Sequence, residues 1–306
     1  MRAQGTGSVY FGFFLASLAA IIWAGNFIIA RGVYKQIGPV SLAFYRWVVA
    51  TIVLFPFAIR KFRMELRAVL RSWQYIFWTS LTGISLFNTF VYIAGRYTSA
   101  INLALIGTTS SPVMAIILAR IFLKEKIGWK KLIGLTICIV GVLFLLSKGK
   151  LTNLVALSFS YGDAWMLLAA FCFAVYNTLV RKKPASISPL TFLFASFLIG
   201  TILLIPFFAW ESANTDIRWH LPLVASVLYL GIGASVIAFL IWNKAIAVLG
   251  AGRTALFGNL IPVFSSFEAV IILKEKFTWV HVTSMIIVFS GLLIANLKTA
   301  NQTPAG

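Results

Sequence analysis

Two charged side chains lie inside long apolar stretches of this sequence. Arg46 falls within residues 40–59, and Glu268 falls within residues 252–273. If such stretches cross a membrane, a charge inside them is costly and marks a candidate functional site. Each lies roughly 8–10 Å from the same predicted end of its helix, at 1.5 Å per residue. We expect both to face one cavity, either paired or bridged by a solute, with Glu268 also able to carry a proton.

Structural roles for these two charges stay open. Arg46 could extend outward along lipid or form a structural hydrogen bond, and the Glu268 carboxyl could stay neutral or bond to a neighbouring helix. Amide and aromatic side chains within the spans are further candidates for contacts with a solute, because an amide in a membrane must find polar partners. These candidates are Trp23, Asn26, Tyr92, Asn102, Trp165, Tyr176, Asn177, Trp242, Asn243 and Asn259.

The composition indicates an integral membrane protein. Of the 306 residues, 60% are hydrophobic, which is more apolar surface than one soluble core can bury. Apolar runs long enough to cross a bilayer recur along the chain, and each is expected to be a helix because a helix satisfies its own backbone hydrogen bonds. The ten predicted transmembrane helices are residues 8–30, 40–59, 73–95, 99–122, 128–147, 162–180, 188–209, 220–243, 252–273 and 278–297.

The sequence repeats itself at a fixed offset of 150 residues. "TIVLFPF" at 51–57 matches "TILLIPF" at 201–207, and "FLKEKIGW" at 122–129 matches "ILKEKFTW" at 272–279. Residues 1–150 and 151–306 are therefore predicted to be two homologous five-helix units. Because five is odd, the second unit would cross the membrane in the opposite sense, as an inverted repeat. Inverted repeats are common in secondary transporters that work by alternating access.

The net charge of +19 is interpreted here as a signal of orientation. The basic residues lie mainly in the loops on one side of the predicted helices, which places both termini in the cytoplasm by the positive-inside rule. The partner that this charge pattern predicts is the lipid bilayer of the cytoplasmic membrane, and no nucleic acid is expected.

Several motifs resemble a known family. They are "WAGNFIIARG" in the first span, "FYR" in the second, "SPVMAIILARIFLKEKIGWKKLIGLTICIVGVLFL" across the fourth and fifth, "GDAWMLLAAFCFAVYNTLVRK" in the sixth and "IPVFSSFEAVIILKEKFTW" in the ninth. Together they resemble the drug/metabolite transporter superfamily, EamA type, over almost the whole chain. The resemblance implies a ten-helix carrier of small metabolites, often an exporter of amino acids or related compounds, that works without ATP.

Other functions are less well supported by the residues. There is no phosphate-binding GxxxxGK[ST] loop, and His220 and His281 have no Cys, Asp or Glu at metal-ligand spacing. No cofactor, metal or enzymatic activity is therefore expected. A membrane enzyme acting on lipid-like or isoprenoid substrates and a passive channel stay open as alternatives. Within the carrier class, drug efflux and uptake of a nucleoside-like metabolite are also open.

Small residues, prolines and the repeated glutamates are expected to shape the scaffold. Gly134 and Gly141, with Ser284 and Gly291 at the same offset, predict close packing of the fifth and tenth helices against each other or a partner, so a homodimer stays open. Pro112 and Pro262 predict bends in the fourth and ninth helices. Glu125 and Glu275, at equivalent turns, are predicted to cap helix N-termini rather than to contact substrate.

Overall fold

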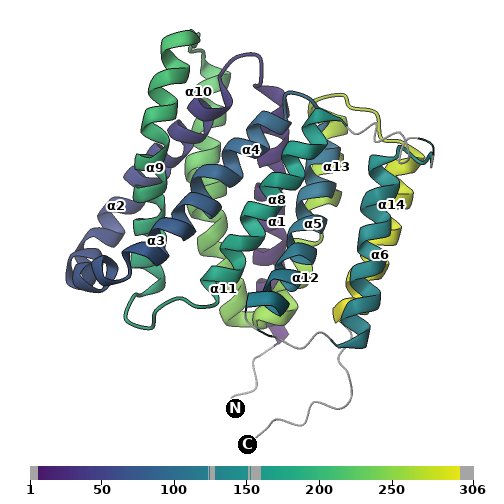
Figure 1. Ribbon diagram of the computed structural model, residues 1–306, viewed down its shortest axis with the longest axis horizontal. Coiled ribbons are helices and arrows are strands. Elements are labelled where there is room, and N and C mark those ends of the chain that lie inside the picture. Colours follow the sequence, from purple (N-terminus) through teal and green to yellow (C-terminus); the bar gives the residue numbers. More distant parts are fainter. Residues whose placement is uncertain (1–5, 123, 125–127, 151, 153–159, 297–306) are drawn as a thin grey trace, which may run out of the picture.

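The structure is a computed structural model that describes residues 6–122, 124, 128–150, 152 and 160–296. Within these ranges the regular elements are all helices, arranged as one bundle (Figure 1). The first half contains α1 (Thr6–Gly32), α2 (Pro39–Arg71), α3 (Trp73–Ser80), the π-helix η1 (Leu81–Leu86), α4 (Phe87–Ala94), α5 (Ala100–Phe122) and α6 (Trp129–Leu146). The second half contains α8 (Tyr161–Val180), α9 (Pro189–Asn214), α10 (Leu221–Leu228), the π-helix η2 (Tyr229–Ile237), α11 (Ala238–Leu249), α12 (Ala251–Gly258), α13 (Ile261–Ile272) and α14 (Trp279–Asn296).

The helices agree closely with the hydropathy of the sequence. In the described ranges, eight helical runs are long and apolar enough to cross a membrane, and two further apolar helices, Leu256–Ile272 and Trp279–Ala295, are shorter. Each predicted span coincides with helical structure. Helix α2 continues beyond the predicted end of the second span at residue 59, as far as Arg71. Its extension is amphipathic, and Val69 is buried in an apolar cluster that includes Phe192 of α9.

The most extensive helix contacts pair equivalent helices of the two halves. α2 packs along α9, and α6 packs along α14. In both pairs, residues that are 150 positions apart meet directly. The hydroxyls of Thr51 and Thr201 lie 3.5 Å apart. The Cys138 thiol donates to the carbonyl oxygen of Val288 at 3.6 Å. Contacts between equivalent residues are those expected near an axis that relates two similar halves.

The α6–α14 interface confirms the predicted close packing of these two helices (Figure 1). A Cβ atom added at Gly134 would collide with the backbone of Gly291, and one added at Gly291 would collide with the carbonyl oxygen of Gly134. At the other end of the contact, the Ser284 hydroxyl donates to the Gly141 carbonyl oxygen at 2.9 Å. The small residues therefore let the two backbones approach closely, as is common between membrane helices.

Three glutamates cap helices that lie far from them in the sequence. Glu211, near the end of α9, accepts from the backbone N–H of Val40 and Ser41 at the start of α2, at 3.3 and 2.6 Å. Glu65, in the extension of α2, accepts from the N–H of Ser188, the N-cap of α9, at 2.8 Å. The antiparallel helices α2 and α9 thus cap each other. Because helix N-termini carry unpaired N–H groups and a partial positive charge, each carboxylate stabilises the helix that it meets.

The third glutamate, Glu275, accepts from the N–H groups of Ala100 and Ile101 at the start of α5, at 2.8 and 3.2 Å. The prediction that Glu275 caps a helix is confirmed, but the capped helix is in the other half of the chain rather than the adjacent α14. Glu125, the equivalent residue of the first half, lies outside the described residues.

The fourth helix of each half differs between the halves. α5 continues as one helix through Pro112, whereas its counterpart is interrupted at Asn259 and Leu260, between α12 and α13. Pro262, the second residue of α13, has no N–H to donate to the carbonyl of Gly258. Of the two prolines that were expected to bend their helices, Pro262 therefore lies next to a helix interruption, whereas α5 is uninterrupted at Pro112.

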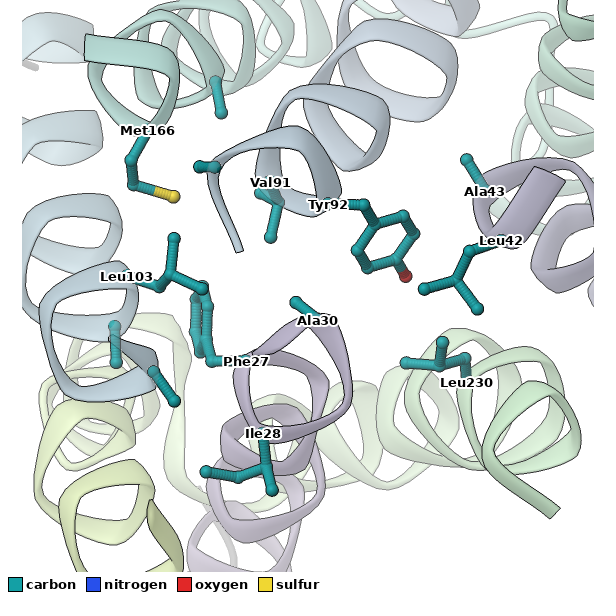
Figure 2. Close-up of a cluster of buried hydrophobic side chains, with 14 of the residues drawn as sticks. Phe27, Ile28, Ala30, Leu42, Ala43, Val91, Tyr92, Leu103, Met166 and Leu230 are labelled. Carbon is teal, nitrogen blue, oxygen red and sulfur yellow. The ribbon is translucent and has the colours of Figure 1, made fainter. Parts of the chain in front are cut away.

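The main apolar core joins helices of both halves. Side chains from α1, α2, α4, α5, α8 and η2 meet in one buried cluster (Figure 2). Tyr92 is 1% exposed, and its hydroxyl points toward α2. A buried hydroxyl needs a polar partner, so this orientation indicates a polar group on α2.

The α6–α14 contact leads to a test of the packing. Gly134→Ala is expected to lower the free energy of unfolding by about 1–3 kcal/mol, because the added methyl group forces two backbones apart. Thermal unfolding of the purified protein in detergent measures this change. Gly128→Ala, just before α6, is the matched control, since a Cβ there meets no atom within 4 Å. Equal melting temperatures for the two variants would contradict the close-packing account.

Candidate functional site

The polar partner of Tyr92 on α2 is Arg46, which is only 5% exposed. Its Nη1 group donates to Oδ1 of Asn26 at 2.6 Å, to Oδ1 of Asn88 at 2.7 Å and to the Tyr92 hydroxyl at 2.8 Å. Its Nε donates to the Ser235 hydroxyl at 2.8 Å. We call these five residues the Arg46 cage. It joins α1, α2, α4 and η2, and therefore both halves of the chain.

Local helix geometry places these partners around the guanidinium. Asn88 and Tyr92 are four residues apart on α4, so their side chains share one face. The Tyr92 hydroxyl also donates to Asn26 at 3.1 Å, which links α1 to α4. In the π-helix η2, the Ser235 hydroxyl donates to the carbonyl of Leu230 at 2.9 Å, which leaves a lone pair for Arg46. Single π-helical turns are frequent at functional sites.

The charge of Arg46 is not neutralised by any of these partners. All four are uncharged, and no carboxylate in the described ranges bonds to the guanidinium. The Nη2 amino group donates to no described oxygen. The Arg46 guanidinium carbon also lies 4.8 Å from the ring centroid of Trp47, where the ring face offers only weak compensation. A buried cation without a counter-ion is costly, so the cage is suited to receive an anion.

The cage exists in one half of the repeat only. At the offset of 150, Arg46 corresponds to Ser196, Asn26 to Tyr176 and Asn88 to Ala238. Tyr92 corresponds to Trp242, and only the serine pair, Ser85 and Ser235, is preserved. The Ser196 hydroxyl is buried without a partner. Because the second half folds without these polar groups, the repeat architecture does not require the cage.

An aromatic cluster lies beside the cage. Trp23 donates from its indole N–H to the carbonyl of Ala234, the neighbour of Ser235, at 3.0 Å. Its ring lies 5.0 Å from that of Trp242 and 5.5 Å from that of Phe239. Trp242 in turn approaches the helix interruption, since a Cβ at Gly258 would lie 3.8 Å from its ring. The aromatic surface thus connects the cage to the break between α12 and α13.

A pocket of about 190 Å³ lies beside this break. Asn259 lines it, together with apolar residues of α5, α6 and α14 and with Lys131 at the start of α6. The amide of Asn259 is therefore placed next to an interrupted helix and an open space.

Glu268 forms no hydrogen bond with the cage residues. It is half-buried on α13, accepts no hydrogen bond from any described residue, and is not among the partners of Arg46. It interacts electrostatically with Tyr229. The Tyr229 hydroxyl donates to the carbonyl of Ile22 on α1 at 2.9 Å, one turn before Asn26. Direct pairing of Arg46 with Glu268, one of the two predicted arrangements, is therefore not seen.

The structure brings together only part of the predicted set. Asn26, Arg46 and Tyr92 meet in the cage, and Trp23 and Trp242 meet beside it. Asn102 bonds to Thr98, Trp165 packs on Phe90, and Tyr176 packs against Phe173 and Gly83, and none of these contacts involves a cage residue. Asn243 is exposed on α11, and Asn177 is only partly buried on α8.

Sequence reasoning missed Asn88 and Ser235. Asn88 could have been found from its spacing of four residues before Tyr92. Ser235 could have been found from its pairing with Ser85 at the offset of the repeat.

Comparison with known proteins agrees with this architecture. The EamA-like transporter family matches the chain twice, over residues 10–147 and 160–297. An uncharacterized transporter of Archaeoglobus fulgidus is 29% identical over 93% of this chain and 96% of its own length. The S-adenosylmethionine uptake transporter of Rickettsia bellii is 27% identical over 88% and 87%. A probable amino-acid metabolite efflux pump of Salmonella typhimurium is 24% identical over 92% and 93%.

One solved crystal structure shares the fold, with a TM-score of 0.60 and 17% identity over 95% of this chain and 97% of that chain. The two family matches begin 150 residues apart and end 150 residues apart, which is the offset found in the sequence and in the α2–α9 and α6–α14 contacts. With its apolar helices, the chain is therefore a multi-pass membrane protein that belongs to the EamA-like transporter family.

Proposed function

We propose that this protein is a secondary carrier for a small metabolite with a carboxylate group, such as an amino acid, and that the Arg46 cage binds this carboxylate. The observation that carries the proposal is the buried Arg46 charge, which has neutral partners only and no counterpart in the second half. A substrate carboxylate would supply the missing negative charge and accept from Nη2. Charge-assisted hydrogen bonds of this kind are strong where water is excluded.

The named relatives fit this substrate class. One is named for amino-acid metabolite efflux and one for S-adenosylmethionine uptake, and S-adenosylmethionine carries the carboxylate and ammonium of an amino acid. The aromatic cluster of Trp23, Trp242 and Phe239 offers a stacking surface for an apolar, aromatic or nucleoside-like portion of the solute. We infer that the substrate combines a carboxylate with such a portion.

Alternating access between inverted halves is the proposed mechanism. The contacts between equivalent residues in the α2–α9 and α6–α14 pairs support two halves related by an axis, with residues 1–150 opposite residues 151–306. The halves differ at their fourth helices, where α5 is continuous and its counterpart is broken. In an inverted repeat, exchanging these two conformations would open the other side of the membrane. We place both termini in the cytoplasm and propose export as the physiological direction.

Substitution of Arg46 tests the substrate class. In proteoliposomes, counterflow of labelled amino acids is expected to fall at least about 30-fold in Arg46→Gln, because losing one partner of a buried charge pair costs about 2 kcal/mol or more. Arg63→Gln is the matched control, since Arg63 is exposed on the α2 extension. For the wild-type protein, the amide analogue of a transported amino acid should compete poorly. Equal transport by wild type and Arg46→Gln, or equal competition by acid and amide, would contradict the proposal.

We further propose that Glu268 binds a coupling proton, because it is a carboxylate within an apolar helix and has no described hydrogen-bond donor. Glu268→Gln is expected to abolish stimulation of transport by a pH gradient while counterflow without a gradient persists, since the amide cannot release a proton. Asp216→Asn, at an exposed position, is the control. Unchanged stimulation by the gradient in Glu268→Gln would remove the proton role.

A further inference from the structure

At one end of the bundle, charged side chains contact the ends of helices. This end, which we call the Glu275 end, is where α1 and α13 finish and α5 begins. A pocket of about 360 Å³ lies here, lined by Arg31, Gly32, Ser99, Leu273, Lys274, Glu275 and Lys276. In the topology predicted from the charges, it faces the outside.

One basic and one acidic side chain hold the link between α4 and α5. Arg31, at the end of α1, donates to the carbonyl oxygens of Gly95 and Arg96 after α4, at 3.1 and 3.2 Å. Glu275 accepts from the N–H groups of Ala100 and Ile101, as described above. Both residues at the start of α5 are fully buried. The link is therefore fixed from α1 on one side and from the turn after α13 on the other.

The backbone just before Glu275 has a conformation that is unusual for a residue other than glycine. Lys274 has φ of 56°, in the left-handed region, which is unfavourable for a residue with a Cβ. This conformation ends α13, and the Glu275 N–H donates back to the carbonyl of Ala269 at 3.2 Å. Lys124 has φ of 54° at the equivalent position of the first half. The sequence keeps a lysine here in both halves although glycine would be easier to accommodate.

The helices joined by Glu275 distinguish it from the other two capping glutamates. Glu65 and Glu211 join α2 to α9, a pair that already packs along its length. Glu275 joins the turn after the broken helix α13 to the continuous helix α5. These are the two helices whose conformations must exchange if the carrier alternates between its two sides.

We propose that Glu275 is a positioning residue for transport: its carboxylate holds the N-terminus of α5 and closes the Glu275 end, and it must release α5 before that end can open. This inference rests on the proposed carrier function for its meaning in transport. The contact itself can be tested without any solute.

Cysteine accessibility provides the test. Ala100→Cys is introduced into a background with Cys138→Ala and Cys172→Ala, and labelling by a polar maleimide is timed in lipid nanodiscs, where both faces are open to reagent. Ala100 is fully buried, so labelling should be slow when Glu275 is present. Glu275→Ala is expected to raise the rate roughly tenfold, as for loss of a strong helix cap. Glu275→Gln, which keeps an acceptor oxygen without the charge, should give an intermediate rate.

Glu211→Ala is the matched control because it removes the same kind of cap from α2. Both alanine variants are expected to lower the melting temperature, but only Glu275→Ala should expose the thiol introduced by Ala100→Cys to the reagent. Unchanged labelling in Glu275→Ala, or an equal increase in Glu211→Ala, would overturn the positioning role. Because the assay contains no solute, these outcomes are separate from the result of Arg46→Gln in transport.

Discussion

The membrane interior offers no water to a hydrogen-bonding group, so a polar or charged group that is buried there without a partner in the chain is costly. The acidic residues show this constraint clearly. Of the seven Asp and Glu residues, Glu65, Glu211 and Glu275 cap helices that are distant in the sequence, and Asp163 completes a capping box with Ser160 at the start of α8. Glu125 lies outside the described residues and Asp216 is exposed. Glu268 is thus the acidic residue within an apolar helix for which no structural partner is described.

The same constraint explains why the Arg46 cage is unusual. Four neutral groups satisfy the hydrogen-bonding needs of Nε and Nη1, but they leave the net charge in place. A purely structural arginine would be expected to have a carboxylate nearby, as buried charges generally do. The cage therefore provides hydrogen-bond partners for Nε and Nη1 but no counter-ion for the positive charge. That combination favours a solute that brings a carboxylate and leaves with it.

Departures from the repeat mark the parts of the molecule that carry function in our proposals. The α2–α9 and α6–α14 pairs follow the offset of 150 residues, and they form the scaffold. Arg46, Glu268 and the break before Pro262 have no equivalent in the other half. The contacts between equivalent helices hold the two similar halves together. A single solute, in contrast, needs one site that the other half does not repeat. The difference between α5 and its broken counterpart also gives the halves two conformations to exchange.

The sequence by itself determined the helical class, the repeat and most helix positions, since hydropathy and internal repetition can both be read along the chain without knowing which helices meet. The predicted span 99–122, for example, is α5 within one residue. It also pointed to Arg46 and Glu268 as unusual charges. Only the tertiary structure decided that Asn88 and Ser235 join Arg46, that Glu268 does not pair with it, and that Glu275 caps α5 rather than α14. Those contacts join residues separated by 42 to 189 positions, and no local pattern encodes which faces of distant helices will meet.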